Sequence, residues 1–413
     1  MKSLFLSFCL LFSFLTVSSS YRYVGGDISL LPEYQKAGAI YNDENGNRID
    51  LLPYMHELGM NAMRVRLFVN PENYTGADKD SNACQTLPYI IPLCKDIISN
   101  GFELLLDFHY SDTWADPAKQ WIPKAWEGQG DDELIRTIYD YTKNTLSVLK
   151  EEGIVPDFIQ PGNEISYGML WGPYGKDNPG NHTYVNSSSA SWQRLANLLN
   201  SAIKACREEC PQARIIIHTE RTSEVDVQKF FYNKMKELKV DYDIIGISYY
   251  PYFHGKINVL NNALNSLEQN FPEKDIMVVE TGYPYAWEVP GTNKPVDYEY
   301  TLEGQNEFAG ELVKTCLAHE KVTGIFWWWL EYNAKGTQLS GWYNAPLFDS
   351  RTGNATPALK TLCSFVEGNQ NGIHSPDVDQ FYDRDSWYDL SGRKIKSPSS
   401  GIYIHNGKLF ICK

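Results

Sequence analysis

Two glutamates at the ends of apolar segments are the residues best suited to chemistry. Glu164 ends the stretch Asp157–Glu164, which begins as an apolar run and finishes in an Asn-Glu pair. Glu280 ends a second apolar run, which starts at Asp275. A carboxyl group at the end of a buried strand is partly removed from water, so its pKa can be shifted for proton transfer. Two such groups, one acting as acid and one as nucleophile, indicate a retaining glycoside hydrolase.

Further polar and aromatic side chains stand at the ends of the other apolar segments. They are Arg66, His109, Asn163, His218, Glu220, Tyr249 and the triplet Trp327–Trp329. A set of such residues on otherwise apolar segments predicts a shared site. For His218 and Glu220, structural and functional roles remain about equally open. Since the triplet must place rings on both faces of its strand, at least one of its rings is expected to pack away from the site.

Two residues of this set have competing interpretations. We expect Arg66 to hold Glu280 in its ionised form, although Arg66 could instead neutralise another buried carboxylate. His109 could be a hydrogen-bonded core histidine, but the polar and aromatic residues that follow it, including Trp114, favour contact with a sugar.

Eight apolar segments with strand character are separated by segments with helical periodicity. The expected strands cover residues 23–29, 61–69, 102–110, 157–164, 213–220, 242–250, 275–280 and 324–330. The expected helices cover residues 49–58, 87–99, 131–150, 191–207, 225–238, 257–270, 302–319 and 357–366. This order predicts an α/β fold, a (β/α)8 barrel in which the carboxyl ends of the strands meet at one face. A doubly wound open sheet is the alternative, but no glycine-rich phosphate loop follows the first strand.

The two ends of the chain differ from this pattern. Residues 1–20 combine a basic start, an apolar run and small residues, as in a secretory signal peptide, and the run is short for a membrane span. We therefore expect an exported protein (extracellular, at the cell surface or periplasmic) whose catalytic barrel covers residues 21–366. Residues 367–413 begin as a linker and continue as short strands with a turn at Asn406-Gly407. They predict a small C-terminal β-module, either a packed structural extension or a sorting-type tail.

Composition limits the class of partner. The 413-residue chain has a formal net charge of −14 and contains 11 tryptophans and 27 tyrosines. The negative charge argues against nucleic acid and anionic membranes and fits a neutral or cationic ligand. Many of the rings must pack in the core, but rings in a groove can stack on sugars. Seven cysteines follow residue 20, and their pairing is left open; no matching histidine set accompanies them, so we expect no metal and no cofactor.

Five segments near strand ends form a specific set. The longest is Leu106–Pro117, which reads Leu-Asp-Phe-His-Tyr-Ser-Asp-Thr-Trp-Ala-Asp-Pro. The shorter ones are Arg64-Val-Arg66, Gly162-Asn-Glu164, Ser248-Tyr-Tyr-Pro251 and Val279-Glu-Thr-Gly-Tyr-Pro284. Together they resemble glycoside hydrolase family 53, the endo-β-1,4-galactanases, over about residues 23–365.

The resemblance implies a retaining, endo-acting barrel enzyme of the clan A type. Its substrates would be β-1,4-galactan, a neutral side chain of pectin (type I arabinogalactan), and galacto-oligosaccharides. It implies that Glu164 is the general acid/base and Glu280 the nucleophile. The residues that it places at the substrate are Arg66, His109, Trp114, Asn163, Tyr249 and Trp328. These roles require a protonated acid beside an ionised nucleophile, so the two carboxyl groups need different surroundings.

Two segments depart from the family pattern. The loop from Tyr285 to Pro295 lacks the ligand-rich segment with which many bacterial members hold calcium, so we expect no calcium there. The last strand has Trp328-Trp329-Leu330 where Trp-Glu-Pro is usual, which leaves the product lengths open. The alternatives are another clan A hydrolase, such as a mannanase or cellulase, and an inactive carbohydrate-binding protein on the same scaffold. We expect a monomer without a membrane span.

Overall fold

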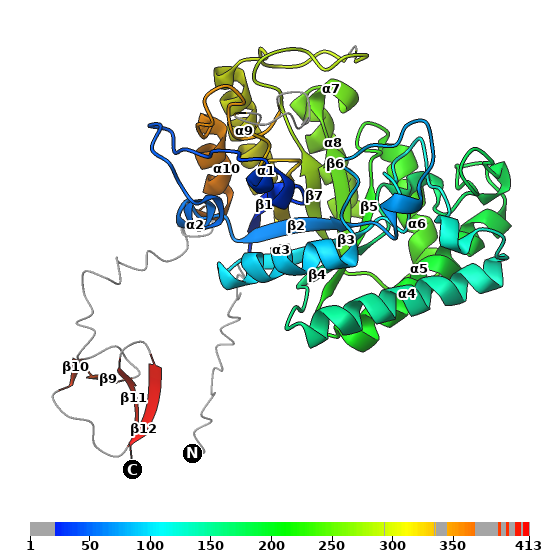
Figure 1. Ribbon diagram of the computed structural model, residues 1–413, viewed down its shortest axis with the longest axis horizontal. Coiled ribbons are helices and arrows are strands. Elements are labelled where there is room, and N and C mark those ends of the chain that lie inside the picture. Colours follow the sequence, from blue (N-terminus) through cyan, green and yellow to red (C-terminus); the bar gives the residue numbers. More distant parts are fainter. Residues whose placement is uncertain are drawn as a thin grey trace, which may run out of the picture. The chain divides into compact units, whose positions relative to one another are not determined.

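Eight parallel strands close into a barrel in the order in which they occur along the chain (Figure 1). The computed structural model describes residues 21–292, 294–333, 335, 345–367, 387–389, 394–395, 401–405 and 408–412. The barrel strands are β1 (Tyr23–Asp27), β2 (Ala62–Leu67), β3 (Glu103–Phe108), β4 (Phe158–Pro161), β5 (Arg214–Thr219), β6 (Ile244–Tyr249), β7 (Asp275–Thr281) and β8 (Val322–Trp327). β8 pairs with β1 and completes the ring. The predicted (β/α)8 barrel is confirmed.

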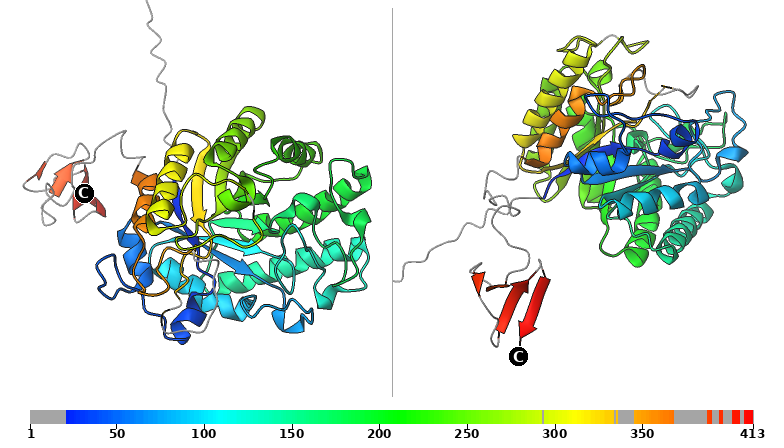
Figure 2. Two further views of the ribbon diagram at one scale, coloured as in Figure 1. Left: turned by 90° about the horizontal axis from the view of Figure 1, so that it is seen from above. Right: turned by 60° about the vertical axis from the view of Figure 1, so that its left-hand side comes forward.

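Helices connect the strands and lie outside them (Figure 2). They are α1 (Leu31–Lys36), α2 (Leu51–Glu57), α3 (Leu87–Ser99), α4 (Asp131–Glu151), α5 (Ser189–Glu209), α6 (Val225–Glu237), α7 (Pro251–His254), α8 (Ile257–Asn270), α9 (Leu302–Leu317) and α10 (Pro357–Glu367). The bounds of α3 and α8 coincide with the predicted ones. Gly101 follows α3 with a φ of 84°, a left-handed conformation that glycine adopts without strain and that ends helices. Among the described residues, no helix is long and apolar enough to cross a bilayer.

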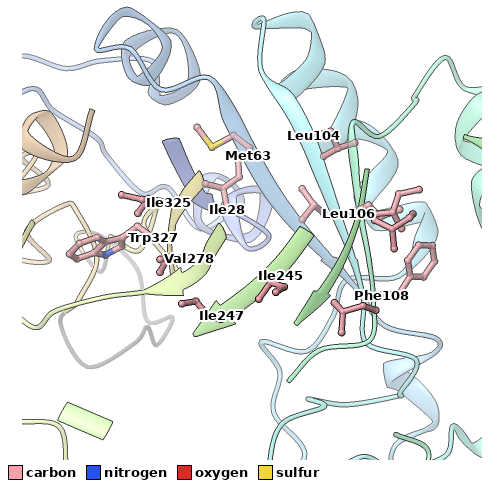
Figure 3. Close-up of a cluster of buried hydrophobic side chains, with 14 of the residues drawn as sticks. Ile28, Met63, Leu104, Leu106, Phe108, Ile245, Ile247, Val278, Ile325 and Trp327 are labelled. Carbon is pink, nitrogen blue, oxygen red and sulfur yellow. The ribbon is translucent and has the colours of Figure 1, made fainter. Parts of the chain in front are cut away.

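The strands divide the core into two layers. Side chains inside the barrel form one cluster, which includes Leu105, Phe158 and Phe326. Side chains that point outward, such as Leu104 and Ile325, pack against the helices in a second and larger cluster (Figure 3). Alternation along each strand assigns a residue to one layer or the other, and it therefore decides which polar side chains can reach a site inside the barrel mouth.

The buried cysteines of the barrel are core residues. Cys94, Cys206, Cys210 and Cys316 are buried and form no disulfide within the described part of the chain. Burial raises the pKa of the Cys206 and Cys316 thiols, which keeps them in the neutral form and makes them poor nucleophiles. These cysteines act as small apolar side chains in the packing of the barrel.

A second unit follows the barrel. The contacts divide the chain between Gly368 and Asn369. The strands of the C-terminal unit are β9 (Trp387–Asp389), β10 (Lys394–Ile395), β11 (Gly401–His405) and β12 (Lys408–Cys412), and they form an antiparallel sheet in the order β10-β9-β11-β12. β11 and β12 pair on either side of the predicted turn at Asn406-Gly407, which itself lies outside the described residues, as does the expected signal segment 1–20.

Candidate active site

A cavity of about 620 Å³ opens at the carboxyl ends of the barrel strands. Its walls come from the loops after β2 and β3 and from the ends of β4 to β8. The residues that line it are Asp80, Asn82, Trp114, Ala115, Asp116, Pro117, Asn163, Glu164, Glu220, Tyr250, Phe253, His254, Glu280, Trp328 and Trp329. Both glutamates singled out in the sequence therefore line one cavity, together with the predicted binding residues Trp114, Asn163 and Trp328.

A sharp turn carries Glu164 to the cavity wall. Strand β4 ends at Pro161, Gly162 then has a φ of 93°, and Glu164 itself has a φ of 47°. A Cβ at Gly162 would lie 2.9 Å from Cγ2 of Ile165, so this position needs glycine both for its conformation and for its size. A left-handed residue other than glycine is strained, and the surrounding structure enforces such strain most often at functional sites.

A β-bulge brings Glu280 to the same cavity. Ile247 of β6 pairs with Val278 of β7, whereas the next residue, Ser248, pairs with Glu280. Val279 is therefore an extra residue in β7, and the alternation of the strand changes at this point. As a result Val279 packs inside the barrel and Glu280, its neighbour, also lines the cavity.

One carboxylate oxygen of Glu280 lies beside a cation and the other accepts a hydrogen bond. Nη2 of Arg64 lies 2.9 Å from Oε1, and the hydroxyl of Tyr250 donates a hydrogen bond to Oε2 over 3.0 Å. Positive charge and hydrogen-bond donors stabilise the ionised form of a carboxyl group. Glu164, by contrast, receives a hydrogen bond to Oε1 from the hydroxyl of Ser248 at 2.7 Å.

The surroundings of the two glutamates shift their pKa values to different extents. Burial raises the pKa of Glu164 well above its ordinary value, and the charges of Glu280 and Glu220 raise it further. Burial also raises the pKa of Glu280, to about 7, but the adjacent Arg64 guanidinium opposes this shift. In such a coupled pair the first proton to be bound belongs mainly to the group with the higher affinity. The contacts of the two groups therefore favour the proton on Glu164 and the ionised form of Glu280.

Arg64, and not Arg66, is the cation that contacts Glu280. The Arg64 guanidinium is fully buried and also lies 2.8 Å from Oδ2 of Asp107 and 2.9 Å from Oδ1 of Asn163. The expectation that Arg66 holds Glu280 ionised is therefore wrong. Both arginines point into the barrel, and it is the deeper one, Arg64, whose side chain reaches Glu280.

Arg66 instead supports the aromatic wall. Its Nη1 lies 2.5 Å from Oδ1 of Asp27, and its guanidinium carbon lies 4.7 Å from the ring centre of Trp114, 5.0 Å from that of Trp328 and 5.2 Å from that of Trp329. The guanidinium is fully buried and does not line the cavity, so the structure does not place it in contact with a substrate. Cation–π contacts of this kind fix the orientation of the indole rings.

His109 is also buried behind the cavity wall. Its Nδ1 accepts a hydrogen bond from the backbone N–H of Ala115 at 3.1 Å, and its Nε2 lies 3.1 Å from Oδ2 of Asp107. The predicted contact between His109 and a sugar is not what the structure shows; the ring holds the segment that carries Trp114. Asn163 does line the cavity, and its Nδ2 donates to the carbonyl of Ala115 at 2.8 Å.

The sequence prediction places Tyr249 at the substrate, but the tyrosine that lines the cavity is its neighbour, Tyr250. Its ring lies in the outer core layer without solvent exposure, and its hydroxyl donates to the carbonyl of Gly255 at 2.9 Å. Ser248 and Tyr250 point to the opposite side of the strand, and Tyr250 contacts Glu280. Because strand side chains alternate, an error of one residue moves the prediction from the site to the helix-facing layer.

The tryptophan triplet divides between the outer layer and the cavity. Trp327 is fully buried in the outer layer, where its Nε1 donates to the carbonyl of Ala345 at 2.7 Å. Trp328 and Trp329 line the cavity, the latter with a φ of 56°. The prediction that at least one ring packs away from the site is correct.

Sequence reasoning missed several cavity residues or left their roles open. Glu220 lines the cavity, where burial raises its pKa to about 7. His218 is fully buried, and its Nε2 lies 2.8 Å from the hydroxyl of Ser248. Phe253, which is 43% exposed at the cavity, comes from the short helix α7. The segment Ser248–Pro251 pointed to this region, but no sequence signal indicated that α7 would continue the wall.

An arginine supplies the positive charge at the centre of the site. The buried carboxylates of Asp27, Asp107 and Glu280 surround the Arg64 guanidinium. Within the described ranges, no three His, Cys, Asp or Glu side chains are grouped in a way that could hold a metal ion. The Arg64 guanidinium provides the positive charge beside these three carboxylates.

Comparison with known proteins gives a consistent assignment. Residues 23–362 match the model of glycosyl hydrolase family 53. An arabinogalactan endo-β-1,4-galactanase of Cellvibrio japonicus is 33% identical over 358 residues, which cover 82% of this chain and 89% of that protein. An endo-β-1,4-galactanase of Bacillus subtilis is 28% identical over 76% of this chain and 72% of its own. The structure of an Ignisphaera aggregans GH53 catalytic domain superposes with a TM-score of 0.70 at 31% identity, covering 84% of this chain and 97% of that domain.

Proposed function

Since the chain belongs to glycosyl hydrolase family 53, we propose that it is a retaining endo-β-1,4-galactanase with Glu164 as general acid/base and Glu280 as nucleophile. The observation that carries the proposal is the contrast between the two carboxyl groups in one cavity. Burial and neighbouring negative charge keep the proton on Glu164, whereas Arg64 and Tyr250 stabilise the ionised form of Glu280.

The first step uses both groups together. The ionised Glu280 attacks the anomeric carbon while Glu164 transfers its proton to the glycosidic oxygen, so the bond to the leaving sugar breaks and a covalent galactosyl-enzyme forms. Arg64 and the Tyr250 hydroxyl hold the attacking carboxylate in place. Without proton transfer from Glu164 the leaving group would depart as an alkoxide, which is unfavourable near neutral pH.

The second step reverses the role of Glu164. Now a carboxylate, Glu164 accepts a proton from a water molecule as that water attacks the anomeric carbon and releases Glu280. Glu280 returns to its ion pair with Arg64, and Glu164 returns to its protonated state. Two displacements at one carbon retain its configuration.

The cavity wall suits a neutral polysaccharide. Trp114, Trp328 and Trp329 form an aromatic surface that can stack on the apolar faces of galactose units, and the cation–π contacts with Arg66 keep it rigid. The net charge of −14 disfavours anionic polymers such as the acidic backbone of pectin. The names of the relatives from Cellvibrio japonicus and Bacillus subtilis support β-1,4-galactan as the substrate.

The location of the reaction is part of the proposal. The basic and apolar residues 1–20 have the pattern of a secretory signal peptide. An exported enzyme would meet galactan as a side chain of pectin outside the cell or in the periplasm. We propose that it acts there as a monomer.

Release of reducing ends tests the substrate and the mechanism together. Wild-type enzyme is incubated with β-1,4-galactan and, in parallel, with mannan, cellulose and β-1,3-galactan, and the products are sized over time. We expect early oligosaccharides of mixed length from β-1,4-galactan alone. Glu280→Ala should abolish turnover but retain galactan binding. Hydrolysis of another polymer in place of galactan would discard the substrate, and binding of galactan without hydrolysis by the wild type would favour the inactive carbohydrate-binding alternative.

A further inference from the structure

A chain of buried polar groups runs from the barrel interior to Glu164. The Ser248 hydroxyl lies 2.7 Å from Oε1 of Glu164 and 2.8 Å from Nε2 of His218. On the other side of the imidazole ring, Nδ1 lies 3.2 Å from Nε2 of Gln160, and this amide donates to Oδ1 of Asp107 at 2.6 Å. Ser248, His218, Gln160 and Asp107 have no solvent exposure. The catalytic roles proposed above involve Glu164 but none of these four residues.

The geometry allows two arrangements of the protons. In the first, His218 carries its proton on Nε2 and donates to Ser248, Ser248 donates to Glu164, and Nδ1 accepts from Gln160. In the second, the proton is on Nδ1 and is donated to Oδ1 of Asn163, which lies 3.0 Å away. Ser248 must then donate to Nε2, and its contact with Glu164 requires a proton on Oε1 of the glutamate.

We propose that the first arrangement is the one in the enzyme, and that Ser248 and His218 are positioning residues that place the acid proton of Glu164 on Oε2. A donor directed at Oε1 leaves Oε2 to carry the proton, and no described residue makes a hydrogen bond to Oε2. In the second arrangement the proton would lie on Oε1, between Glu164 and Ser248, where it cannot reach a glycosidic oxygen. The inference rests on the proposed role of Glu164 as general acid/base.

The catalytic cycle itself favours the first arrangement. Glu164 must act as a carboxylate after the first displacement, and a carboxylate can only accept hydrogen bonds. Ser248 can donate to Glu164 in both of its protonation states if His218 always donates to Ser248. The hydrogen bonds from His218 to Ser248 and from Ser248 to Glu164 then keep the same direction in both steps, as is expected of a preorganised site.

The electrostatic surroundings keep His218 neutral, so that only one of its nitrogens carries a proton. Burial and the charge of Arg64 lower the pKa of His218 well below its ordinary value. The other titratable groups near His218 are Asp107 and His109, and those near Glu164 are Glu280, Glu220 and Asp116. Asn163 already accepts a hydrogen bond from Nη2 of Arg64 at 2.9 Å, so a proton on Nδ1 would also lie close to a positive charge.

The tautomer of His218 can be measured directly. Wild-type enzyme is labelled with 15N-histidine, and the His218 signals are identified by their loss in His218→Gln. We expect a protonated Nε2 and an unprotonated Nδ1 throughout the pH range in which the enzyme is folded. A protonated Nδ1 would overturn the proposal. This readout needs no substrate, so it does not depend on the identity of the polysaccharide.

Leaving-group dependence tests the consequence for catalysis. Ser248→Ala should lower kcat/KM for galactan by about 10-fold to 100-fold, because proton transfer to the leaving sugar becomes inefficient. For 2,4-dinitrophenyl β-1,4-galactobioside, whose leaving group needs no proton, the loss should stay below about threefold. Ser248→Thr, which keeps the hydroxyl, should restore much of the galactan activity. Equal losses on both substrates would show that Ser248 has only a structural role.

A matched control removes a serine hydroxyl elsewhere in the barrel. Ser201 on α5 donates to the carbonyl of Ile135 at 2.6 Å, and Ser201→Ala should leave both activities unchanged. His218→Phe, which removes the donor to Ser248, should reproduce the selective loss on galactan. If wild-type enzyme hydrolyses neither substrate, the proposed function fails. If Ser248→Ala or His218→Phe loses activity selectively on the activated galactobioside, the positioning role of Ser248 and His218 is contradicted.

Discussion

Nη2 of Arg64 lies 2.9 Å from Oε1 of Glu280 and, at the same time, 2.8 Å from Oδ2 of Asp107. One buried guanidinium nitrogen therefore links the proposed nucleophile on β7 to the interior of β3. A planar guanidinium can serve several acceptors in fixed directions, which an ammonium group cannot do. The ion pair thus sets both the charge and the position of Glu280.

Replacement of Arg64 should impair the nucleophile specifically. Arg64→Lys keeps a positive charge but loses the fork geometry, so we expect kcat to fall by about 10-fold to 100-fold. With a weaker ion pair the pKa of Glu280 rises, and the acidic limb of the kcat/KM profile moves to higher pH. Steady-state kinetics on galactan across pH measures both effects.

Arg66 provides the comparison for this variant. It lies on the same face of β2 but contacts Asp27 and the tryptophan rings. Arg66→Lys should weaken the aromatic wall and raise KM, while the acidic limb stays in place. An equal shift of the acidic limb in both variants would contradict the assignment of Arg64 as the partner of Glu280.

Adjacent tyrosines at the end of β6 offer a second matched pair. The hydroxyl of Tyr250 donates to Oε2 of Glu280, whereas that of Tyr249 donates to the carbonyl of Gly255 in the outer layer. Tyr250→Phe should lower kcat by about 10-fold or more, because the nucleophile loses a directed hydrogen bond. Tyr249→Phe should leave kcat within about twofold. It should lower only the free energy of unfolding, by about 1 kcal/mol. A larger kinetic effect at Tyr249 than at Tyr250 would contradict this division of the two rings between the site and the outer layer.

The pH dependence follows from the raised pKa values of both glutamates. In the proposed mechanism the active form has Glu280 ionised and Glu164 protonated, so kcat/KM should rise with pH as Glu280 loses its proton near its pKa of about 7. It should fall again at higher pH, where Glu164 loses its proton, since burial and neighbouring charges raise that pKa further. Two carboxyl groups with ordinary pKa values would give a maximum of kcat/KM at about pH 4. The maximum of this enzyme should therefore lie at higher pH. A maximum of kcat/KM near pH 4 in stable enzyme would refute this picture.

Glu331 should make folding stability depend on pH. It is fully buried, Oε1 accepts a hydrogen bond from the backbone N–H of Leu30 at 3.0 Å, and burial raises its pKa to about 8. The unfolded chain releases this proton at lower pH than the folded protein does, so this group causes stability to fall as pH rises toward 8. Glu331→Gln removes that loss and should be more stable than wild type at alkaline pH, by about 1 kcal/mol or more.

Thermal unfolding at acidic and alkaline pH checks this prediction. The difference between wild type and Glu331→Gln should be small near pH 4 and should grow toward pH 9, a range that brackets the ordinary and raised pKa values of the group. Glu237→Gln, which changes an exposed glutamate on α6, should show no such pH-dependent difference. A constant difference between Glu331→Gln and wild type at all pH values would show that Glu331 does not titrate in this range.

The sequence by itself determined the barrel and the two glutamates. Apolar runs of strand length alternating with amphipathic helices have few other solutions, and the α3 and α8 boundaries followed from local signals such as Gly101. Carboxyl groups at the ends of two such runs must meet at one face of the barrel, so the pairing of Glu164 with Glu280 follows from the order of the elements alone.

Only the tertiary structure decided which neighbours face these glutamates. Side chains on a strand alternate with a period of two, so placing Tyr249 in the site instead of Tyr250 selects the wrong layer of the core. The bulge at Val279 changes this alternation on β7, and no residue type announces it. The depth at which Arg64 and Arg66 lie, and the hydrogen bonds that join His218 to Ser248, depend on contacts between residues far apart in the chain. Such contacts are properties of the closed barrel, because the strands that supply them become neighbours only when the sheet is complete.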